Sequence, residues 1–525
     1  MPSAVTTALR NASAAGSPPR NRRRLALGLI VFAACMVAAA LLWHRWWPFE
    51  QPTVIENLQE ASDSQVHAKT FHRSYFPPGC VLDGVVFVHG KGVRPLITID
   101  RLTIRASYAG ILARHISQIT AEGMHVIIPA FGTGEAFHTT PSSLTIGEIV
   151  ANGATVEVAP QDGGKDPFRF QFHEAVFNDV GWKDPLTYRV QVRNPNPPGE
   201  ITAEGKFGVW DEADPAQTAV SGNYTFAQAD LSVYRGIAGT LSSAGKFRGN
   251  LGHIDILGTT DTPNFEVTTG KHPVHLTTEF SAYVDATHGD TFLKRVDAQF
   301  RKTHIVAKGS IAKSEKDSGK TARIELGTNN GRLEDLLGLF VKQERSPMSG
   351  AVSLRATVEL PPGDEPFLKR VTLQGTFGIG GGEFSAPATQ EGVDKLSAGA
   401  RGEKESADPE TVVTDLKGQV NLGNGVAQFA DLSFGVPGAR ARMHGSYNVI
   451  NHKIDLRGQM RVDTKISNTT TGAKAFLLKM MDPFFKKKKK GEILPIRISG
   501  TYDNPSFGLD LGDDKARVAP RTQGH

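Results

Sequence analysis

Three short patterns in the sequence contain residues that could carry out chemistry. Ser243 and Lys246 have the SxxK spacing, in which a lysine assists a serine that attacks an acyl group. The stretch 318–321 reads SGKT, like the end of a phosphate-binding loop. His272 and His275 form the closest histidine pair, and two imidazoles are a common start of a zinc site.

None of these patterns is accompanied by the rest of its site. No second motif of the acyl-serine enzymes accompanies Ser243, and Ser314 stands where a phosphate-binding loop begins with glycine. The text HPVHLTTEF around the two histidines is typical of a strand. We therefore expect no catalytic residues, no metal and no cofactor, and we predict that the protein is not an enzyme.

The composition favours a chain rich in strands and turns. Among 525 residues there are 55 glycines and 30 prolines, with 39% hydrophobic and 8% aromatic residues. The net charge of +5, from 59 basic and 54 acidic residues, gives no indication of a nucleic-acid-binding protein. Cys35 and Cys80 are the only cysteines, and they lie in segments that should not meet, so we expect no disulfide.

The clearest segment is the uncharged run Leu25 to Trp43, which is long enough to cross a bilayer core of about 30 Å as a helix. Five arginines precede it, and the first acidic residue is Glu50, so the positive-inside rule places the N-terminus in the cytoplasm. Trp43, Trp46 and Trp47 suit the interface where the chain leaves the membrane. A cleaved signal peptide is the alternative, since the alanines from 33 to 40 offer small-residue sites.

The region after the anchor alternates between apolar and polar residues with a period of two, which predicts strands with one dry and one wet face. We expect about thirty strands, at twelve to fifteen residues for each strand and turn. Helices should be few and short, at Val54 to Phe71, Ser107 to Gln118 and Gly331 to Lys342. The predicted fold is mainly β: an elongated, curled antiparallel sheet after an N-terminal transmembrane helix.

Two internal repeats support related β-units. The pattern IxAxGxxV occurs in 119–129 and again thirty residues later in 149–160, which predicts two copies of a strand, glycine turn and strand. The pattern GTxDxPxF occurs in 258–265 and in 500–507, and its Asp-x-Pro predicts a turn between two strands.

The dry face must be buried in one of two ways. The strands could pack on one another as sandwiches or barrels with a side-chain core. Alternatively, the sheet could curl into an open trough whose apolar lining is covered by acyl chains. Alternation alone favours the filled core, because such cores are more common.

The region after the predicted membrane helix, which we call the exported region because the N-terminus is expected in the cytoplasm, is similar at both ends to the AsmA family of bacterial envelope proteins. SYFPPG at 74–79 with RPLITIDRLTIRASYAGILARHISQITAEGMHVIIP resembles its N-terminal unit. VPGA at 436–439, LPIRISG at 494–500 and NPSF at 504–507 resemble its C-terminal region. The resemblance implies an inner-membrane anchor, a periplasmic β-groove and a relation to bridge-like lipid transfer proteins that move phospholipid toward the outer membrane. It brings no catalytic residues.

The resemblance implies that the apolar face of the predicted strands lines a lipid-binding groove. The candidate groove residues are Phe168, Phe170, Phe172, Tyr188, Val190, Val192, Leu354, Val358, Leu373 and Leu456. The expected organisation is a cytoplasmic basic tail (1–24), the transmembrane helix (25–43), a juxtamembrane segment (44–78), a periplasmic β-groove (79–389), a flexible linker or loop (390–411), an AsmA-like C-terminal β-region (412–511) and a disordered tail (512–525).

An apolar block followed by five lysines lies just before the LPIRISG strand. Aromatic side chains could enter a lipid interface while lysines attract phosphate. The membrane-contact candidates are Phe476, Leu477, Leu478, Met480, Met481, Phe484, Phe485, Lys486, Lys487, Lys488, Lys489 and Lys490. The alternative is a helix packed on the sheet end with a solvated lysine loop.

The expected function is to bind and conduct phospholipid along the groove for outer-membrane lipid homeostasis. The expected partners are phospholipid acyl chains, the inner membrane, and an outer-membrane surface or envelope proteins, without nucleic acid. The alternative is a structural or assembly factor of the envelope with a side-chain-filled β-core.

Overall fold

The computed structural model describes residues 47–89, 96–128, 144–158, 167–181, 183–211, 213–313, 319–342, 344–385, 390–391, 393, 413–436, 439–462, 493–502 and 504–510. The predicted membrane helix (25–43), most of the predicted linker (390–411), the membrane-contact candidates (476–490) and the C-terminal tail (512–525) lie outside the described residues.

The described chain is mainly β, as the alternation predicts, and forms one sheet of 26 strands. The first thirteen labels are β1 Ser64–His67, β2 Thr70–Tyr75, β3 Pro78–His89, β4 Ile97–Ala106, β5 His115–Glu122, β6 His125–Ile128, β7 Thr145–Val158, β8 Phe168–Val180, β9 Leu186–Pro195, β10 Pro198–Phe207, β11 Ala219–Asp230, β12 Ile237–Ala238 and β13 Thr240–Asn250. The others are β14 His253–Val267, β15 Val274–Asp285, β16 Asp290–Phe300, β17 Thr303–Lys313, β18 Lys320–Arg332, β19 Met348–Leu360, β20 Thr372–Phe384, β21 Thr414–Gly423, β22 Val426–Val436, β23 Ala439–Asn448, β24 Lys453–Val462, β25 Ile493–Thr501 and β26 Pro505–Leu509.

Most strands pair antiparallel with the strand that precedes or follows them in the chain. The sheet is nevertheless mixed, which corrects the expectation of a purely antiparallel one. Strands β5 and β6 both pair in parallel with β7, with Ile119 beside Ile149, Ala121 beside Ala151 and Val126 beside Val156. These are equivalent positions of the thirty-residue repeat, so the two copies lie side by side. Gly153 does not end its strand: it has φ +63° within β7.

The two GTxDxPxF copies have different structures. The second forms the predicted turn, between the end of β25 and the start of β26. For the first copy the prediction is wrong, because Pro263 lies inside β14, where the register with β15 shifts between Thr262 and Phe265. A proline cannot donate to the ladder, and a bulge is one of the few places where a strand accepts it.

The helices are few and shorter than expected. They are α2 Gln51–Ser62, α3 Tyr108–Ala113, α4 Leu333–Gly338 and α5 Phe367–Arg370, with two 3-10 turns at Pro215–Gln217 and Leu231–Val233. The expected helix from Val54 to Phe71 ends at Ser62, because Asp63 adopts a left-handed conformation and the chain then enters β1. Similarly, Arg114 ends α3 in a left-handed conformation, and the residues that follow form β5.

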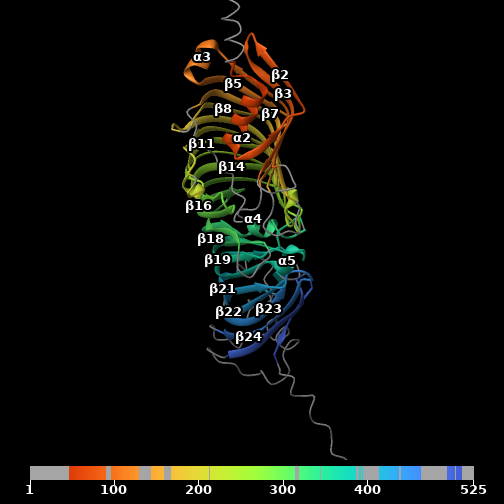
Figure 1. Cartoon of the computed structure of the whole chain (residues 1–525). Helices are drawn as coiled ribbons and strands as arrows, with labels where there is room; N and C mark the ends of the chain where they lie inside the picture. The colour runs from red at the N-terminus through yellow and green to blue at the C-terminus, as the bar shows by residue number, and fades with distance from the viewer. Residues whose placement is uncertain are drawn as a thin grey trace, which may run out of the picture.

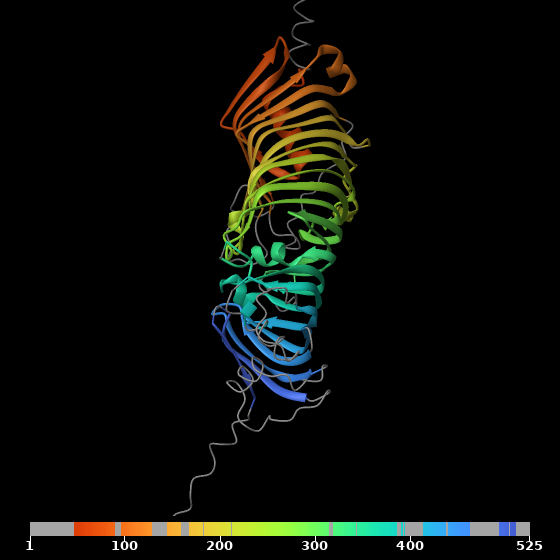
Figure 2. The same cartoon turned by 180° about the vertical axis from the view of Figure 1, so that it is seen from behind.

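The sheet is long and curls along its length around one side, and α2 lies inside the curl near the N-terminal end (Figure 1). From behind, the strands form a continuous series of arcs from the red N-terminal to the blue C-terminal end (Figure 2). Strand β21 pairs directly with β20 over seven residues, from Ile379 to Leu373. The sheet is therefore continuous across the segment that the sequence suggests as a linker.

Candidate functional site: the inner apolar face of the sheet

The strand register places apolar residues on a single face through the whole sheet. Residues that are directly opposite in an antiparallel pair share a face. In the middle strands, Val190 is paired with Ala203 and Ile201 is paired with Phe226, so these residues lie on the same side of the sheet. Further along, Leu354 faces Phe377 and Leu456 faces Ile498. We call this the inner face, because it is the face on which α2 packs inside the curl.

All ten groove candidates lie on this inner face. The pairing of β8 with β7 and β9 places Phe168, Phe170 and Phe172 of β8 on the same face as Tyr188, Val190 and Val192 of β9. Leu354, Val358 and Leu373 are joined through β19 and β20, and Leu456 lies on β24. Val192 is buried, eight are half-buried, and Phe168 is exposed. The alternation was sufficient to assign each side chain to a face; whether these residues contact lipid stays a prediction.

The opposite face carries the charged residues, which form ion pairs between neighbouring strands. Arg189 and Glu204 approach to 3.5 Å, Lys308 and Glu325 to 3.0 Å, and Arg323 and Glu359 to 2.9 Å. These side chains are exposed to solvent, and such pairs contribute little to stability. The outer face is therefore polar and solvated, and the inner face of the same strands has no charged side chains.

The inner face carries a buried side-chain cluster near each of its two ends, and half-buried Leu456 packs against the C-terminal one. At the N-terminal end, Val54, Ile55 and Leu58 of α2 pack into a cluster that contains Leu82, Leu102 and other buried residues of β3 and β4. At the C-terminal end, a second cluster joins β22 to β25, with Met443 and Leu494 almost fully buried. Both clusters have the side-chain core that a stable sheet needs.

Between these ends the inner face is mostly half-buried. Val192 and Ala282 are buried, but most of the apolar side chains around them keep part of their surface accessible. These half-buried residues are Tyr188, Val190, Ile201, Ala203, Phe207, Tyr224, Phe226, Phe247, Ile254, Ile256, Phe280, Val296, Ala298, Ile305, Ala307, Ile324 and Leu326. A contiguous apolar surface of this kind is typical of a binding groove.

Helix α4 packs on the ends of neighbouring strands in the middle of the sheet. Leu336 and Leu339 pack against Val267 and Phe300, at the ends of β14 and β16. The carboxylate of Asp335, which is only 6% exposed, accepts hydrogen bonds from the Thr303 hydroxyl at 2.8 Å and from the Lys302 amide at 3.1 Å. The buried acid therefore ties the helix to the turn between β16 and β17.

The middle of the inner face has a feature that the sequence reading missed. Aromatic rings lie over glycines of neighbouring strands: a Cβ atom at Gly245 would meet the Cε1 atom of Tyr224 at 2.8 Å, and one at Gly222 would meet the Cζ atom of Phe247 at 2.9 Å. Only glycine leaves room for a ring this close to the backbone. Glycines within strands, opposite aromatics, were the available signal.

These rings sit in an apolar environment. Burial raises the pKa of the Tyr188 phenol to about 12. The hydroxyl of Tyr224 lies 3.1 Å from the Oγ atom of Ser243, so the polar tip is satisfied within the sheet. The resulting surface is broad, apolar and without charge.

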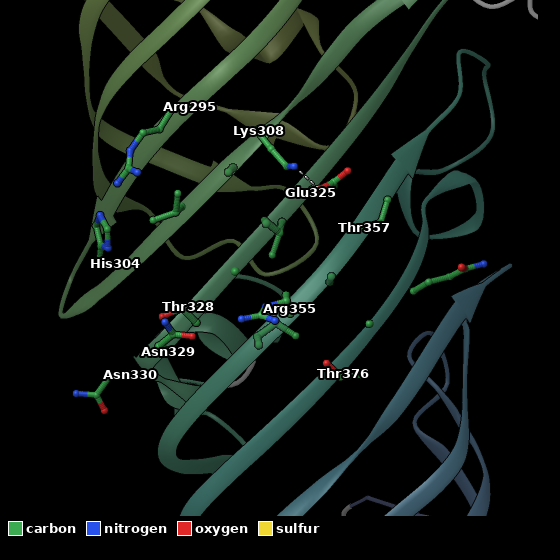
Figure 3. Close-up of a pocket in the computed structure, with 18 of the residues that line it drawn as sticks. Arg295, His304, Lys308, Glu325, Thr328, Asn329, Asn330, Arg355, Thr357 and Thr376 are labelled. Atoms are coloured by element: carbon green, nitrogen blue, oxygen red, sulfur yellow. Dashed lines mark ion pairs between the residues drawn. The ribbon is translucent and has the colours of Figure 1, made fainter.

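Hollows of about 900 and 700 Å³ lie on the outer face of the described strands and share His304. The larger one crosses β16 to β20 (Figure 3). Several of its cations are already neutralised: Lys308 lies 3.0 Å from Glu325, and Arg295 donates two hydrogen bonds to Asp297 at 2.5 and 2.7 Å. Both hollows are lined mainly by outer-face residues, although Leu326 and Leu354 also border the larger one and Phe226 the smaller one. The charged residues in these linings do not suit acyl chains.

Two of the patterns that suggested chemistry, the SxxK spacing and the histidine pair, do not assemble a site among the described residues, whereas Ser314 and Ser318 of the third lie outside them. Ser243 and Lys246 are three residues apart on one strand, so their side chains lie on opposite faces. His275 pairs with Asp261 at 2.5 Å on the solvent-exposed side. In the part of the chain that the structure describes, no group of three or more His, Cys, Asp or Glu residues could hold a metal ion.

None of the helices within the described ranges is long and apolar enough to span a bilayer.

The chain was also compared with models of protein families, with curated proteins and with solved structures, and no match was found in any of the three comparisons.

Proposed function

We propose that this protein is anchored in the bacterial inner membrane by Leu25 to Trp43 and binds phospholipid acyl chains on the inner face of a periplasmic β-sheet. The lipid moves along that face toward the outer membrane. The observation that carries the proposal is the continuous, uncharged inner face, which has a buried side-chain cluster near each end and is half-buried between them. The AsmA-like motifs at both ends of the exported region are consistent with it.

The physical basis is the transfer of methylenes out of water. Each buried methylene gains about 0.8 kcal/mol, which is sufficient to retain an acyl chain. Neighbouring positions on the face are chemically alike, so a bound chain can slide with little change in free energy. The inner-face groups in the middle strands are aliphatic, aromatic, glycine or hydroxyl groups, so we expect no selection among headgroups, which stay in water along the open edge.

The test is photo-crosslinking from the inner face. Photo-reactive residues placed at Leu354 and at Leu456 should capture mixed phospholipids that reflect the composition of the membrane, as identified by mass spectrometry. The matched controls are Arg355 and Asp455, the adjacent residues on the outer face, which should capture almost none. Capture of a single headgroup would contradict a non-selective face.

A second function is favoured by a different observation, the two side-chain cores at the ends of the sheet. If these cores are the purpose of the fold, the protein is a structural or assembly factor of the envelope. Crosslinkers at Leu354 and Leu456 that capture no lipid in the membrane-bound protein would favour this function instead.

A further inference from the structure

Four large side chains are exposed together at the N-terminal end of the sheet. Phe76 is 86% exposed and Leu112 is 89% exposed, while Tyr75 and Tyr108 are 38% and 43% exposed. We call these four residues the apolar tip. Water contact of this extent is unfavourable for a phenylalanine and a leucine, and an exposed apolar cluster marks an interaction surface.

The tip is held in place by the fold. Phe76 lies in the turn between β2 and β3, and Leu112 lies on α3. The Tyr108 hydroxyl donates a hydrogen bond to the carbonyl oxygen of Tyr75 at 2.7 Å, which joins the two segments. The hydroxyl of Ser107 caps α3 by accepting from the amide of Gly110 at 2.9 Å. The two segments therefore present one surface.

The tip lies close to the point where the chain leaves the predicted membrane helix. The ring of Trp47, the first described residue, packs on the ring of Tyr75 with centroids 4.9 Å apart. The apolar run ends at Trp43, four residues earlier, and four residues span at most about 14 Å. The anchor therefore holds the apolar tip near the surface of the bilayer.

The charges around the tip match a phospholipid surface. The segments 70–78 and 105–115 contain three arginines, Arg73, Arg105 and Arg114, and no acidic residue, although Glu50 from outside them pairs with Arg73 at 2.5 Å. The guanidinium of Arg73 lies 5.5 Å from the centre of the Tyr75 ring. Aromatic and aliphatic side chains flanked by arginine are suited to the boundary between headgroups and acyl chains, where phosphates attract the cations.

We propose that the apolar tip inserts into the bilayer leaflet from which the chain emerges and holds the N-terminal end of the sheet against that leaflet. The occupant of this surface is the phospholipid interface itself. The inference rests on the membrane anchoring in the proposed function and adds where lipid is taken up: a phospholipid would leave the leaflet beside the tip and pass the side-chain cluster under α2 to reach the half-buried part of the inner face.

The test uses the full chain reconstituted in nanodiscs of phosphatidylethanolamine and phosphatidylglycerol that contain a spin-labelled phospholipid. A Leu112→Cys variant in a Cys35→Ala background carries a fluorophore at position 112. The native thiol of Cys80 is only 1% exposed and should not be labelled. The matched control is Leu257→Cys, also an exposed leucine at 64% but on the outer face of β14, far from the N-terminal end.

We expect quenching by the spin-labelled lipid to be several-fold stronger at position 112 than at position 257. Adding Phe76→Glu to the labelled Leu112→Cys protein should reduce this quenching several-fold, whereas Leu257→Glu should not. Equal quenching at the two labelled positions would overturn the inference, as would quenching at 112 that Phe76→Glu leaves unchanged.

The outcomes separate this inference from the proposed function. A protein that does not elute with the nanodiscs lacks the anchor, which removes the premise of both. A protein that elutes with the nanodiscs, and captures lipid at Leu354 without quenching at position 112, overturns the inference alone. Strong quenching at 112 without lipid capture at Leu354 supports the tip and contradicts lipid conduction.

Discussion

At the scale of single residues, Cys80 is tightly packed in the cluster near the N-terminal end of the sheet. It lies on β3 within the cluster of buried residues beneath α2, and its side chain is 1% exposed. Burial raises the pKa of its thiol from 9.0 to about 12, because the thiolate would lose its hydration there. The thiolate is the reactive form, so this cysteine is expected to be inert in the folded protein.

We predict that Cys80 resists alkylation in a Cys35→Ala variant at neutral to mildly alkaline pH and reacts promptly once the chain is unfolded in urea. The folded thiol stays protonated up to about pH 12, whereas the unfolded thiol ionises above about pH 9. Its contribution to stability is therefore present below pH 9 and is lost as the pH rises from 9 toward 12.

The measurements are the rate of thiol modification and the free energy of unfolding against pH. A Cys80→Ala variant should lose less stability than the parent over this alkaline range. Fast alkylation of the folded protein, with no change in its unfolding midpoint, would show that the thiol is accessible.

The strand is the element at which the sequence was most informative. A period of two assigns Val190 to the dry face and Gln191 to the wet face, and the register agrees, with Val190 opposite Ala203 and Gln191 opposite Thr202. Which strands pair in parallel was not predicted, because β5 and β7 need a crossover whose direction leaves no trace in the alternation. The Asp-x-Pro pattern at Pro263 predicts a turn but forms a bulge, because the local chemistry of proline permits both.

The lengths of the helices and the contacts between aromatic rings and glycines could not be predicted from the sequence either. The helical spacing at 107–118 extends past Ala113, but pairing of β5 with β4 and β7 outweighs five more residues of helix. The contact of Tyr224 with Gly245 depends on which strands are neighbours, so it could be found only after the register was known.

We predict that Val190→Arg destabilises the protein, whereas Gln191→Arg has little effect. Val190 packs beside buried Ala175 in a cluster without a partner for a cation, so the guanidinium must lose its hydration or force the strand apart. The expected cost is about 2–4 kcal/mol, against about 0.5 kcal/mol or less for the exposed position 191. Urea unfolding of the two variants measures both values.

The reverse order, with Gln191→Arg the more damaging substitution, would mean that the strand parity is wrong. A large loss for both variants would indicate that the β8 to β10 region tolerates no added bulk on either face.

At the scale of the whole molecule, the proposed function makes the inner face of the single continuous sheet a path with two ends. The N-terminal end carries the apolar tip and follows the predicted membrane helix. The C-terminal end lies at β26, beyond a second core. If lipid enters at the tip, every molecule that reaches the C-terminal strands must pass the aromatic rings of the middle strands, including Tyr224.

We therefore predict that Tyr224→Glu interrupts the path. A carboxylate in the middle of the inner face would require an acyl chain to displace water from a charge, and this cost is not repaid by any cation on that face of β11 and its neighbours. Thr225→Glu is the matched control, because Thr225 is the adjacent exposed residue on the outer face. Thermal unfolding confirms beforehand that both variants are folded.

Photo-crosslinkers at Val190 and Leu456 then report on the two sides of the block. In the Tyr224→Glu protein, capture of phospholipid at Val190 should remain near the level of the unsubstituted chain, while capture at Leu456 should fall several-fold; the Thr225→Glu protein should change at neither position. A loss at Val190 with capture retained at Leu456 would mean that lipid enters from the C-terminal end. Unchanged capture at both positions would mean that lipid reaches each part of the inner face from solution, so that the face binds lipid without conducting it.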